Sequence, residues 1–430
     1  MVMLRRLVRS RVRKVLTKEK EIALEPTMPS LETHFREFEE LGIYLHIPFC
    51  EQICPYCPYN KEIYHPAVAA SYAEAVRAEI DLYSGLIGHK PVTSLYIGGG
   101  TPTTMLHNGL PDILRHIFRT FDVRCDIHLE SHPNHLNRQN LDTIAALGIN
   151  HLSIGVESLQ DRHLKTLRRP YGVRDVKAAV GRAVNAGFKC VNTDMIFGLP
   201  DQTNEEVEQA GRVLVEMGVD QVAAYPLFIF PYTHFGEAAK KQQFKSSAVF
   251  KRRKMLSILE RIFYGAGFER TSVWAFTRKS VAKYCSVTVP LYVGLGASGG
   301  SYLKDVFYLN TFRVAEYVNA LGGGRMPIAL SLELSEDMQM AGWLYWRIYE
   351  TRFLKSDFKI RFGRDFDTVY GRYVGPMSLL GLLDDDGDQI VLTDRGTFWL
   401  HALEDLFSIN YIGKLWGGLM QSPWPQRVAL

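Results

Sequence analysis

The sequence predicts an α/β protein built on a partial parallel barrel. From residue 43 onward, apolar strand-like runs alternate with helical patterns, which is typical of a parallel sheet with crossover helices. The joints also repeat, because Gly148, Gly187 and Gly218 each end a helical pattern just before the next strand-like run. Six such units fill about 190 residues, whereas a closed eight-unit barrel needs about 250, so we expect an open or partial (β/α)6 barrel.

The six expected strands lie at residues 43–47, 94–97, 126–130, 151–154, 190–196 and 221–225. The helices between them carry apolar stripes, of which Val173, Val176, Val180 and Val184 form one. Thr203 has the capping-box spacing and starts the helix before the sixth strand. We expect this barrel unit to span residues 41–245, with an extension over 246–330.

Polar or glycine-rich motifs follow each expected strand. In parallel barrels the carboxyl ends of the strands meet on one rim, where functional groups gather. Glycines let a backbone approach a ligand closely, and carboxylates suit a ribose or an ammonium group, although a lone carboxylate can equally be a helix cap. After a cysteine loop at the first strand, the motifs in order are Gly98 to Gly100, Glu130, Glu157, Asp194 and Tyr225.

The cysteine loop carries Cys50, Cys54 and Cys57 in a C-x3-C-x2-C spacing. Three thiolates can hold an iron–sulfur cluster and leave one of four irons open to a ligand. A disulfide framework does not fit six cysteines in 430 residues, and structural zinc lacks a fourth ligand at a usual spacing. The remaining cysteines, Cys125, Cys190 and Cys285, are expected to be small buried hydrophobes.

The positive net charge of +4 is concentrated at the N-terminus. Residues 1–20 contain eight basic residues and one acidic residue, so the rest of the chain is net acidic. Apolar residues at helical spacing predict a basic amphipathic helix in an arm over 1–40, which can rest on an anionic membrane surface, a partner or nucleic acid. A solvated terminus and a transit peptide are the alternatives. No apolar run is long enough to cross a bilayer.

Two glycine motifs near residue 296 lack the context that would make them functional on their own. GLGASG at 294–299 fits a dinucleotide pattern and GASGG at 296–300 fits a nucleophile elbow, but neither has the required neighbouring elements. Beyond residue 330 the pattern becomes mostly helical, with one strand-like run at 390–392. We expect a small winged-helix-like domain over 331–430 that serves as a lid on the rim rather than as a reader of nucleic acid.

Several motifs together resemble the radical S-adenosylmethionine (SAM) superfamily, and within it the group around oxygen-independent coproporphyrinogen III oxidase. They are YLHIPFC at 44–50 with the cysteine triad, GGGTP at 98–102, Glu130, SIGVES at 153–158, DMIFGLP at 194–200, GLGA at 294–297 and YLN at 308–310. The resemblance implies a radical SAM partial barrel and a [4Fe-4S] cluster on Cys50, Cys54 and Cys57. SAM would bind the open iron and be cleaved by one electron to methionine and a deoxyadenosyl radical.

The resemblance also implies a set of cofactor contacts. By motif position, a second SAM would meet Glu157, which we also predict to be catalytic, together with Gly296 and Ala297. The first SAM would be held by Tyr44, Tyr56, Gly99, Gly100, Thr101, Glu130, Arg169, Asp194 and Ile196.

Two departures from the oxidase pattern shape the expected reaction. Tyr59 stands where those oxidases usually carry a fourth cysteine, and Glu157 stands where they commonly have Gln. Our leading hypothesis is therefore methyl or methylene transfer from a second SAM to an unsaturated or aromatic small molecule, as in related methylases and cyclopropane-forming enzymes. The alternatives are oxidative decarboxylation of coproporphyrinogen III, or another tetrapyrrole reaction, and haem binding as a chaperone. We expect a flavodoxin or ferredoxin as electron donor, no nucleic acid, and a cytoplasmic location.

Overall fold

The computed structural model describes residues 2–36, 38–244, 247–282 and 289–430, without the side chains of residues 2–8 and 406. Cys285 and its expected burial lie outside this set. Six parallel strands pair in chain order and confirm all six sequence predictions. They are β2 (Leu41–Ile47), β5 (Pro91–Gly99), β7 (Ile127–Ser131), β8 (His151–Glu157), β9 (Cys190–Phe197) and β10 (Gln221–Pro226).

Further strands extend this block at both edges. Beyond β10 lie the antiparallel strands β12 (Ala275–Arg278) and β11 (Phe268–Arg270). Beyond β2 lie the parallel strand β13 (Tyr292–Leu295) and the antiparallel strands β14 (Gly300–Leu303), β15 (Val306–Asn310) and β16 (Ile328–Glu333). Within the described residues the outermost strands β11 and β16 do not pair with each other, so the barrel is open as predicted.

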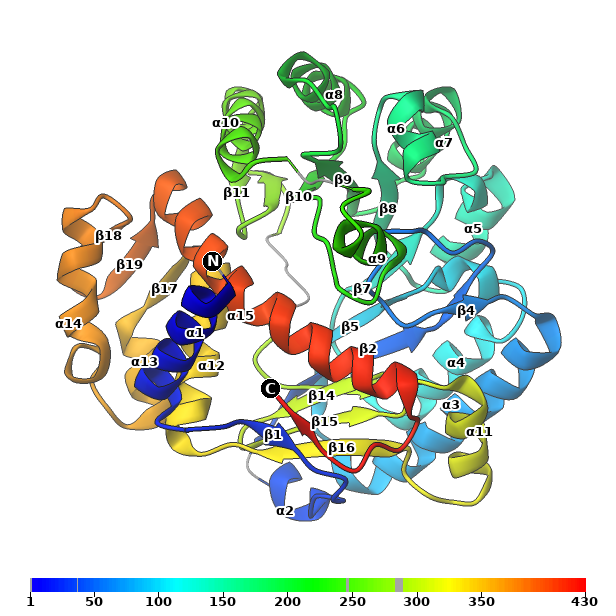
Figure 1. The fold of residues 1–430 in the computed structure, drawn as a ribbon. Coiled ribbons are helices and arrows are strands. Elements are labelled where there is room, and N and C mark those ends of the chain that lie inside the picture. Colours follow the sequence, from blue (N-terminus) through cyan, green and yellow to red (C-terminus); the bar gives the residue numbers. More distant parts are fainter. Residues whose placement is uncertain (1, 37, 245–246, 283–288) are drawn as a thin grey trace.

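Helices cover the outer face of the curved sheet (Figure 1). Val176 and Val180 of the predicted apolar stripe lie on one of these helices and are fully buried. The predicted capping box is formed, because Thr203 accepts from the backbone N–H of Glu206 while the Glu206 carboxylate accepts from that of Thr203. The outer helices are α3 (Pro66–Ile87), α4 (Leu110–Thr120), α5 (Arg138–Ala146), α6 (Asp161–Thr166), α7 (Val173–Val184), α8 (Asn204–Glu216) and α10 (Val249–Gly265).

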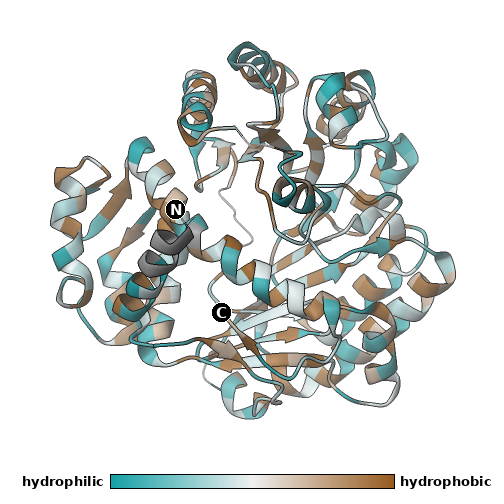
Figure 2. Cartoon of the chain, in the orientation of Figure 1, coloured by the Kyte–Doolittle hydropathy of each residue, from teal (hydrophilic) through white to brown (hydrophobic). Residues whose placement is uncertain are grey.

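Short elements complete the barrel. The strands β3 (Phe49–Cys50) and β4 (Glu62–Ile63) bracket the cysteine loop and pair with each other. β6 (Asp122–Val123) pairs in parallel with the N-terminal part of β5. The helix α9 (His234–Lys240) follows β10, and α11 (Val314–Gly322) joins β15 to β16. Figure 2 shows apolar residues along the sheet strands, whereas the surrounding helices carry both apolar and polar residues, as amphipathic helices do.

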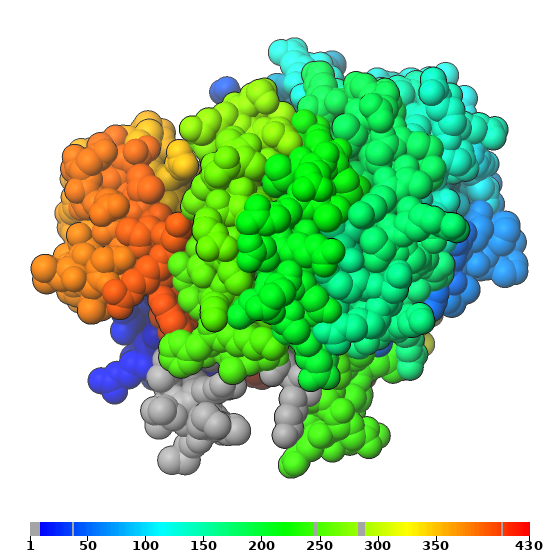
Figure 3. Space-filling view, turned by 90° about the horizontal axis from the view of Figure 1, so that it is seen from above, coloured from blue at the N-terminus to red at the C-terminus, as the bar shows by residue number. Residues whose placement is uncertain are grey.

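The C-terminal region is a small unit with its own core, as the winged-helix prediction requires. Its helices are α12 (Glu336–Tyr349), α13 (Lys355–Phe362) and α14 (Phe366–Leu379), and its three strands are β17 (Arg352–Leu354), β18 (Leu383–Asp385) and β19 (Gln389–Leu392). Seen from above, this unit forms a lobe beside the barrel (Figure 3). The last helix, α15 (Asp394–Gln421), leaves the lobe and crosses the open side of the barrel (Figure 1).

The N-terminal arm contains the predicted helix and docks on the C-terminal region. α1 (Val2–Thr17) packs on α12 and α15, and the Arg13 side chain donates to the backbone carbonyls of Leu430 and Lys20. The short strand β1 (Ala23–Leu24) pairs with β20 (Val428–Ala429), and α2 (Leu31–Phe35) follows it. In the part of the chain described, no helix combines the length and apolarity needed to span a membrane.

Candidate active site

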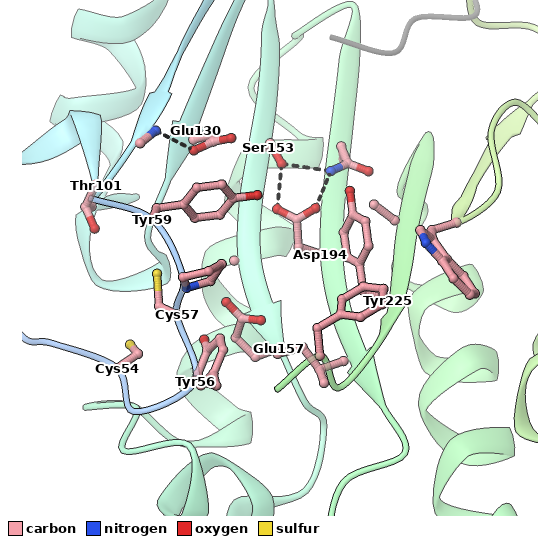
Figure 4. A pocket seen from close by; sticks show the side chains of 18 of the residues that line it. Cys54, Tyr56, Cys57, Tyr59, Thr101, Glu130, Ser153, Glu157, Asp194 and Tyr225 are labelled. Carbon is pink, nitrogen blue, oxygen red and sulfur yellow. Dashed lines mark hydrogen bonds between the residues drawn. The ribbon is translucent and has the colours of Figure 1, made fainter. Parts of the chain in front are cut away.

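One cavity of about 480 Å³ lies at the carboxyl ends of the parallel strands. This volume lies within the range of small-molecule binding sites. In Figure 4, Glu130, Glu157 and Asp194 extend into the same space as Cys54 and Cys57. The cavity brings together most of the predicted site residues: Cys50, Cys54, Tyr56, Cys57, Gly99, Gly100, Thr101, Glu130, Glu157, Arg169, Asp194 and Ile196.

The three cysteines occupy one loop that opens into the cavity. Cys50 is buried at the end of β3, and Cys54 and Cys57 are half-buried. The hydroxyl of Thr101 donates to Cys50 Sγ at 3.5 Å, and Arg169 Nη1 donates to Cys54 Sγ at 3.2 Å. Burial raises the pKa of Cys50 to about 11 and also raises that of Cys57, so thiolates here require a cationic partner such as iron.

The spacing of these thiols does not suit a single metal ion. Among the described residues, no three His, Cys, Asp or Glu side chains converge closely enough to hold one ion. The ligands of one tetrahedral zinc lie within about 4 Å of one another, whereas a four-iron cluster holds its thiolates at separate corners. The donor set therefore fits a wide cluster better than mononuclear zinc.

Glycines allow the loop after β5 to pass close to the cysteine loop. A Cβ atom on Gly100 would lie 2.7 Å from the carbonyl oxygen of Phe49 and 3.0 Å from Cys50 Sγ. Gly99 has a φ of +119° and donates its N–H to Glu130 Oε2 at 3.0 Å. The Tyr96 hydroxyl donates to the other oxygen of Glu130 at 2.8 Å, so this carboxylate fixes the ends of both β5 and β7.

A second carboxylate of the cavity lining, half-buried, lies on β9. Ser153 donates its hydroxyl to Asp194 Oδ2 at 2.9 Å, and Asn192 donates to Asp194 Oδ1 at 3.1 Å (Figure 4). Burial, together with the negative charges of Glu157 and Glu130, raises the pKa of Asp194 to about 7. The cavity thus presents carboxylates that a cationic or hydroxyl-rich ligand can satisfy.

Arg169 connects the cysteine loop to the end of β8. Its guanidinium donates to Cys54, to the carbonyl oxygen of Gly155 at 3.0 Å and to the Tyr171 hydroxyl at 2.6 Å. Its Nη2 atom lies 3.6 Å from Glu157 Oε1. Burial raises the pKa of Glu157, and the charge of Arg169 opposes that shift.

Three predicted cofactor contacts lie outside the cavity lining. Tyr44 stacks behind Tyr96 with ring centroids 6.3 Å apart. The N–H of Gly296 donates to Glu79 Oε2 at 2.7 Å, and the N–H of Ala297 donates to the Tyr72 hydroxyl at 2.9 Å. The glycine motif at 294–297 is therefore packed against α3. A side chain on Gly296 would clash there, because its Cβ atom would overlap the Tyr72 hydroxyl.

Inward-facing polar residues on the strands were not predicted as part of the site. His128 and His151 pair across β7 and β8 with ring centroids 4.2 Å apart, and both line the cavity. The sequence did contain a signal for this position. Residues two apart on a strand point to the same face, and the histidines lie two residues before Glu130 and Ser153 respectively, so they share the inward face. Burial lowers the pKa of His128 to about 3, so this imidazole is neutral.

The opposite wall of the cavity comes from α12, α15 and the segment before β12. It contributes one histidine and one carboxylate of α15 and several aromatic rings. None of these residues belongs to a motif that the sequence analysis recognised. The lining residues from this wall are Trp274, Tyr345, Tyr349, His401, Asp405, Ser408, Ile409 and Ile412.

Comparison with known proteins identifies the class of this site. Residues 44–214 match the profile of the radical SAM superfamily. The chain is 24% identical over 360 residues to the heme chaperone HemW of Bacillus subtilis, covering 82% of this chain and 95% of that protein. It is 25% identical over 378 residues to an oxygen-independent coproporphyrinogen III oxidase of Cereibacter sphaeroides, covering 81% and 79%.

The solved structure of the radical SAM coproporphyrinogen III oxidase HemN from Escherichia coli has the same fold. It superposes with a TM-score of 0.78 at 20% identity, covering 89% of this chain and 94% of that one. Residues 44–214 of this chain are thus a radical SAM domain. Over most of its length the chain is similar to proteins of the HemN-like group, and the radical SAM family implies a [4Fe-4S] cluster and SAM as cofactors.

Proposed function

We propose that this protein cleaves SAM reductively at a cluster held by Cys50, Cys54 and Cys57, and uses the radical on a tetrapyrrole in the same cavity. The observation that carries this proposal is the single cavity that joins the cysteine loop, the strand-end carboxylates and the α15 wall. When bound, the cluster supplies the electron that splits SAM into methionine and a deoxyadenosyl radical. The proposed electron donor is a flavodoxin or a ferredoxin.

The strand-end residues suit the binding of SAM. Glu130 and Asp194 are half-buried acceptors for the ribose hydroxyls or the ammonium group, and the Gly99 and Gly100 backbone leaves room beside the cluster loop. Arg169 orients the loop through Cys54 and shields Glu157. A substrate bound between this rim and α15 would be positioned to give a hydrogen atom to the radical that bound SAM would supply.

Two observations favour a tetrapyrrole reaction over methyl transfer. The relatives that align with most of this chain are named for haem or coproporphyrinogen. The residues predicted for a second SAM are also separated, because Glu157 lines the cavity whereas Gly296 and Ala297 do not. Methyl or methylene transfer remains a prediction that product analysis can decide.

A second candidate function is haem handling. It is favoured by the near full-length alignment with proteins named heme chaperone HemW. In this case the protein would bind haem with a fixed stoichiometry and would not turn over SAM when a reduced tetrapyrrole is supplied.

The test is anaerobic reconstitution with iron and sulfide, followed by mass spectrometry of reductant-driven SAM turnover with and without coproporphyrinogen III. We expect deoxyadenosine and release of carbon dioxide. Cys54→Ala should abolish both, and Cys125→Ala, a cysteine outside the cavity lining, should retain both. S-adenosylhomocysteine in the products would indicate methyl transfer. Stoichiometric haem binding without deoxyadenosine would indicate the chaperone.

A further inference from the structure

The α15 wall of the cavity contains a buried histidine between two carboxylates. His401 is 4% exposed, and its Nδ1 atom lies 3.1 Å from Glu404 Oε2. Its Nε2 atom lies 3.2 Å from Asp405 Oδ1. Because the two carboxylates flank both ring nitrogens, they favour the imidazolium form, and the group of three then carries a net charge of −1.

Asp405 retains capacity to accept further hydrogen bonds. A carboxylate has two oxygens with about four acceptor sites, and His401 occupies one of them. Asp405 lines the cavity, and its side chain is 22% exposed. Arg252 of α10 adds a second positive charge near this carboxylate. Asp405 therefore presents a free carboxylate acceptor site to the ligand space.

Aromatic rings surround His401, which holds this acceptor. The rings of Trp274, Tyr349 and Phe228 lie 5.1, 5.6 and 6.4 Å from the His401 ring, measured between centroids, and all three rings line the cavity. Trp274 Nε1 also lies 3.2 Å from His401 Nε2, an interaction that requires neutral imidazole and so competes with Asp405. Flat rings of a ligand can stack on such walls.

Cations of the cavity lining lie elsewhere. Among the described lining residues, the Lys and Arg side chains are Lys61 and Arg169, and both are engaged by the cysteine loop. The α15 wall thus offers no lysine or arginine for the carboxylate side chains of a substrate. It suits a ring system that donates hydrogen bonds from ring N–H groups.

We infer that Asp405, supported by His401 and walled by Trp274 and Tyr349, is the subsite that accepts the pyrrole N–H groups of a reduced tetrapyrrole. This inference rests on the proposed function. A porphyrinogen has saturated bridges, so its four N–H groups can tilt toward one side and converge on a single carboxylate. An oxidised porphyrin is flat and has two N–H groups and two bare nitrogens, so it makes a poorer donor to the same acceptor.

Equilibrium binding tests the subsite without any SAM turnover. Coproporphyrinogen III and coproporphyrin III are titrated anaerobically into the reconstituted protein, and the quenching of tryptophan fluorescence is followed. We expect the native protein to bind the porphyrinogen at least about tenfold more tightly, the range of a hydrogen bond to a charged group. Asp405→Asn should weaken porphyrinogen binding by about tenfold or more and should remove the preference.

The control is Asp384→Asn, which removes a carboxylate from the exposed hairpin of the C-terminal lobe and should leave both affinities unchanged. Equal affinity of the native protein for both tetrapyrroles would overturn the subsite, whether or not the variant folds. An equal loss for both ligands in Asp405→Asn would also overturn it. Failure of the proposed function has a separate signature, because the protein would then form no deoxyadenosine, whatever the binding result.

Discussion

The two sides of the cavity differ in how the chain builds them. On the strand side, the functional groups lie on the parallel strands or in the loops that follow them, and neighbouring strands follow one another in the sequence. On the α15 side, the contact between Trp274 and His401 joins residues 127 positions apart. The strand side therefore forms whenever the barrel folds, whereas the α15 side also requires the C-terminal lobe to dock.

This difference separates two kinds of expected failure. Changes on the strand side should impair cofactor binding and leave the packing of the lobe intact. Changes on the α15 side should weaken the packing of the C-terminal lobe against the barrel as well as any ligand contact. Ligand affinity and stability, measured for variants from each side, show how independent the two sides are.

The largest effect is expected for Glu130→Ala on the strand side. This change leaves the Tyr96 hydroxyl and the Gly99 N–H without their acceptor, and it frees the glycine loop beside the cluster. We expect the affinity for SAM to fall by about 100-fold, as for loss of more than one hydrogen bond to a charged group. Isothermal titration of the reconstituted protein measures it, with Glu208→Gln on the outer helix α8, outside the cavity lining, as a control. An unchanged affinity would show that Glu130 does not shape the SAM site.

On the other side, His401→Gln should lower stability in a pH-dependent way. The carboxylates of Asp405 and Glu404 outweigh burial and raise the pKa of His401 from 6.5 to about 9. Its contribution is then complete below pH 6.5 and is lost as the pH rises through 9, with a size of about 2 to 3 kcal/mol. Thermal unfolding of the native and variant proteins should differ at pH 6 and converge near pH 9.5. A constant difference across this range would contradict the imidazolium assignment.

The sequence allowed the strand side to be predicted for a physical reason. A strand, its terminal motif and the next helix are contiguous, so the alternation of elements places Cys50, Glu130 and Asp194 on one rim without long-range information. The glycine motif near Gly296 is ambiguous in the sequence, because close packing against Glu79 and close approach to a cofactor require the same residue type. His401 lies inside a long helix with no local motif, and only the crossing of α15 over the barrel gives it a role.

A third expected effect is the pH dependence of SAM binding through Asp194. Burial and the charges of Glu157 and Glu130 raise the pKa of Asp194 from 3.8 to about 7. If the ionised carboxylate binds SAM, the affinity should fall by up to about tenfold for each pH unit below 7 and should level off above it. Asp194→Asn should flatten this profile. A native profile that is already flat between pH 5.5 and 8 would assign recognition to another group.

The smallest effect tests a purely local feature of the barrel. Thr203 accepts a hydrogen bond from the Glu206 N–H at 3.2 Å, and the Glu206 carboxylate accepts from the Thr203 N–H at 2.9 Å. Thr203→Ala removes one half of this capping box and should cost about 1 kcal/mol. Thr203→Ser keeps the hydroxyl and should restore most of that loss, which thermal unfolding can resolve as a shift of roughly 1 °C in a chain of this length. Because α8 lies on the outer face of the barrel, the affinities for SAM and for coproporphyrinogen III should not change in either variant. A change in either affinity would mean that the helix ends and the rim are coupled, and that the two sides of the cavity are less independent than their construction suggests.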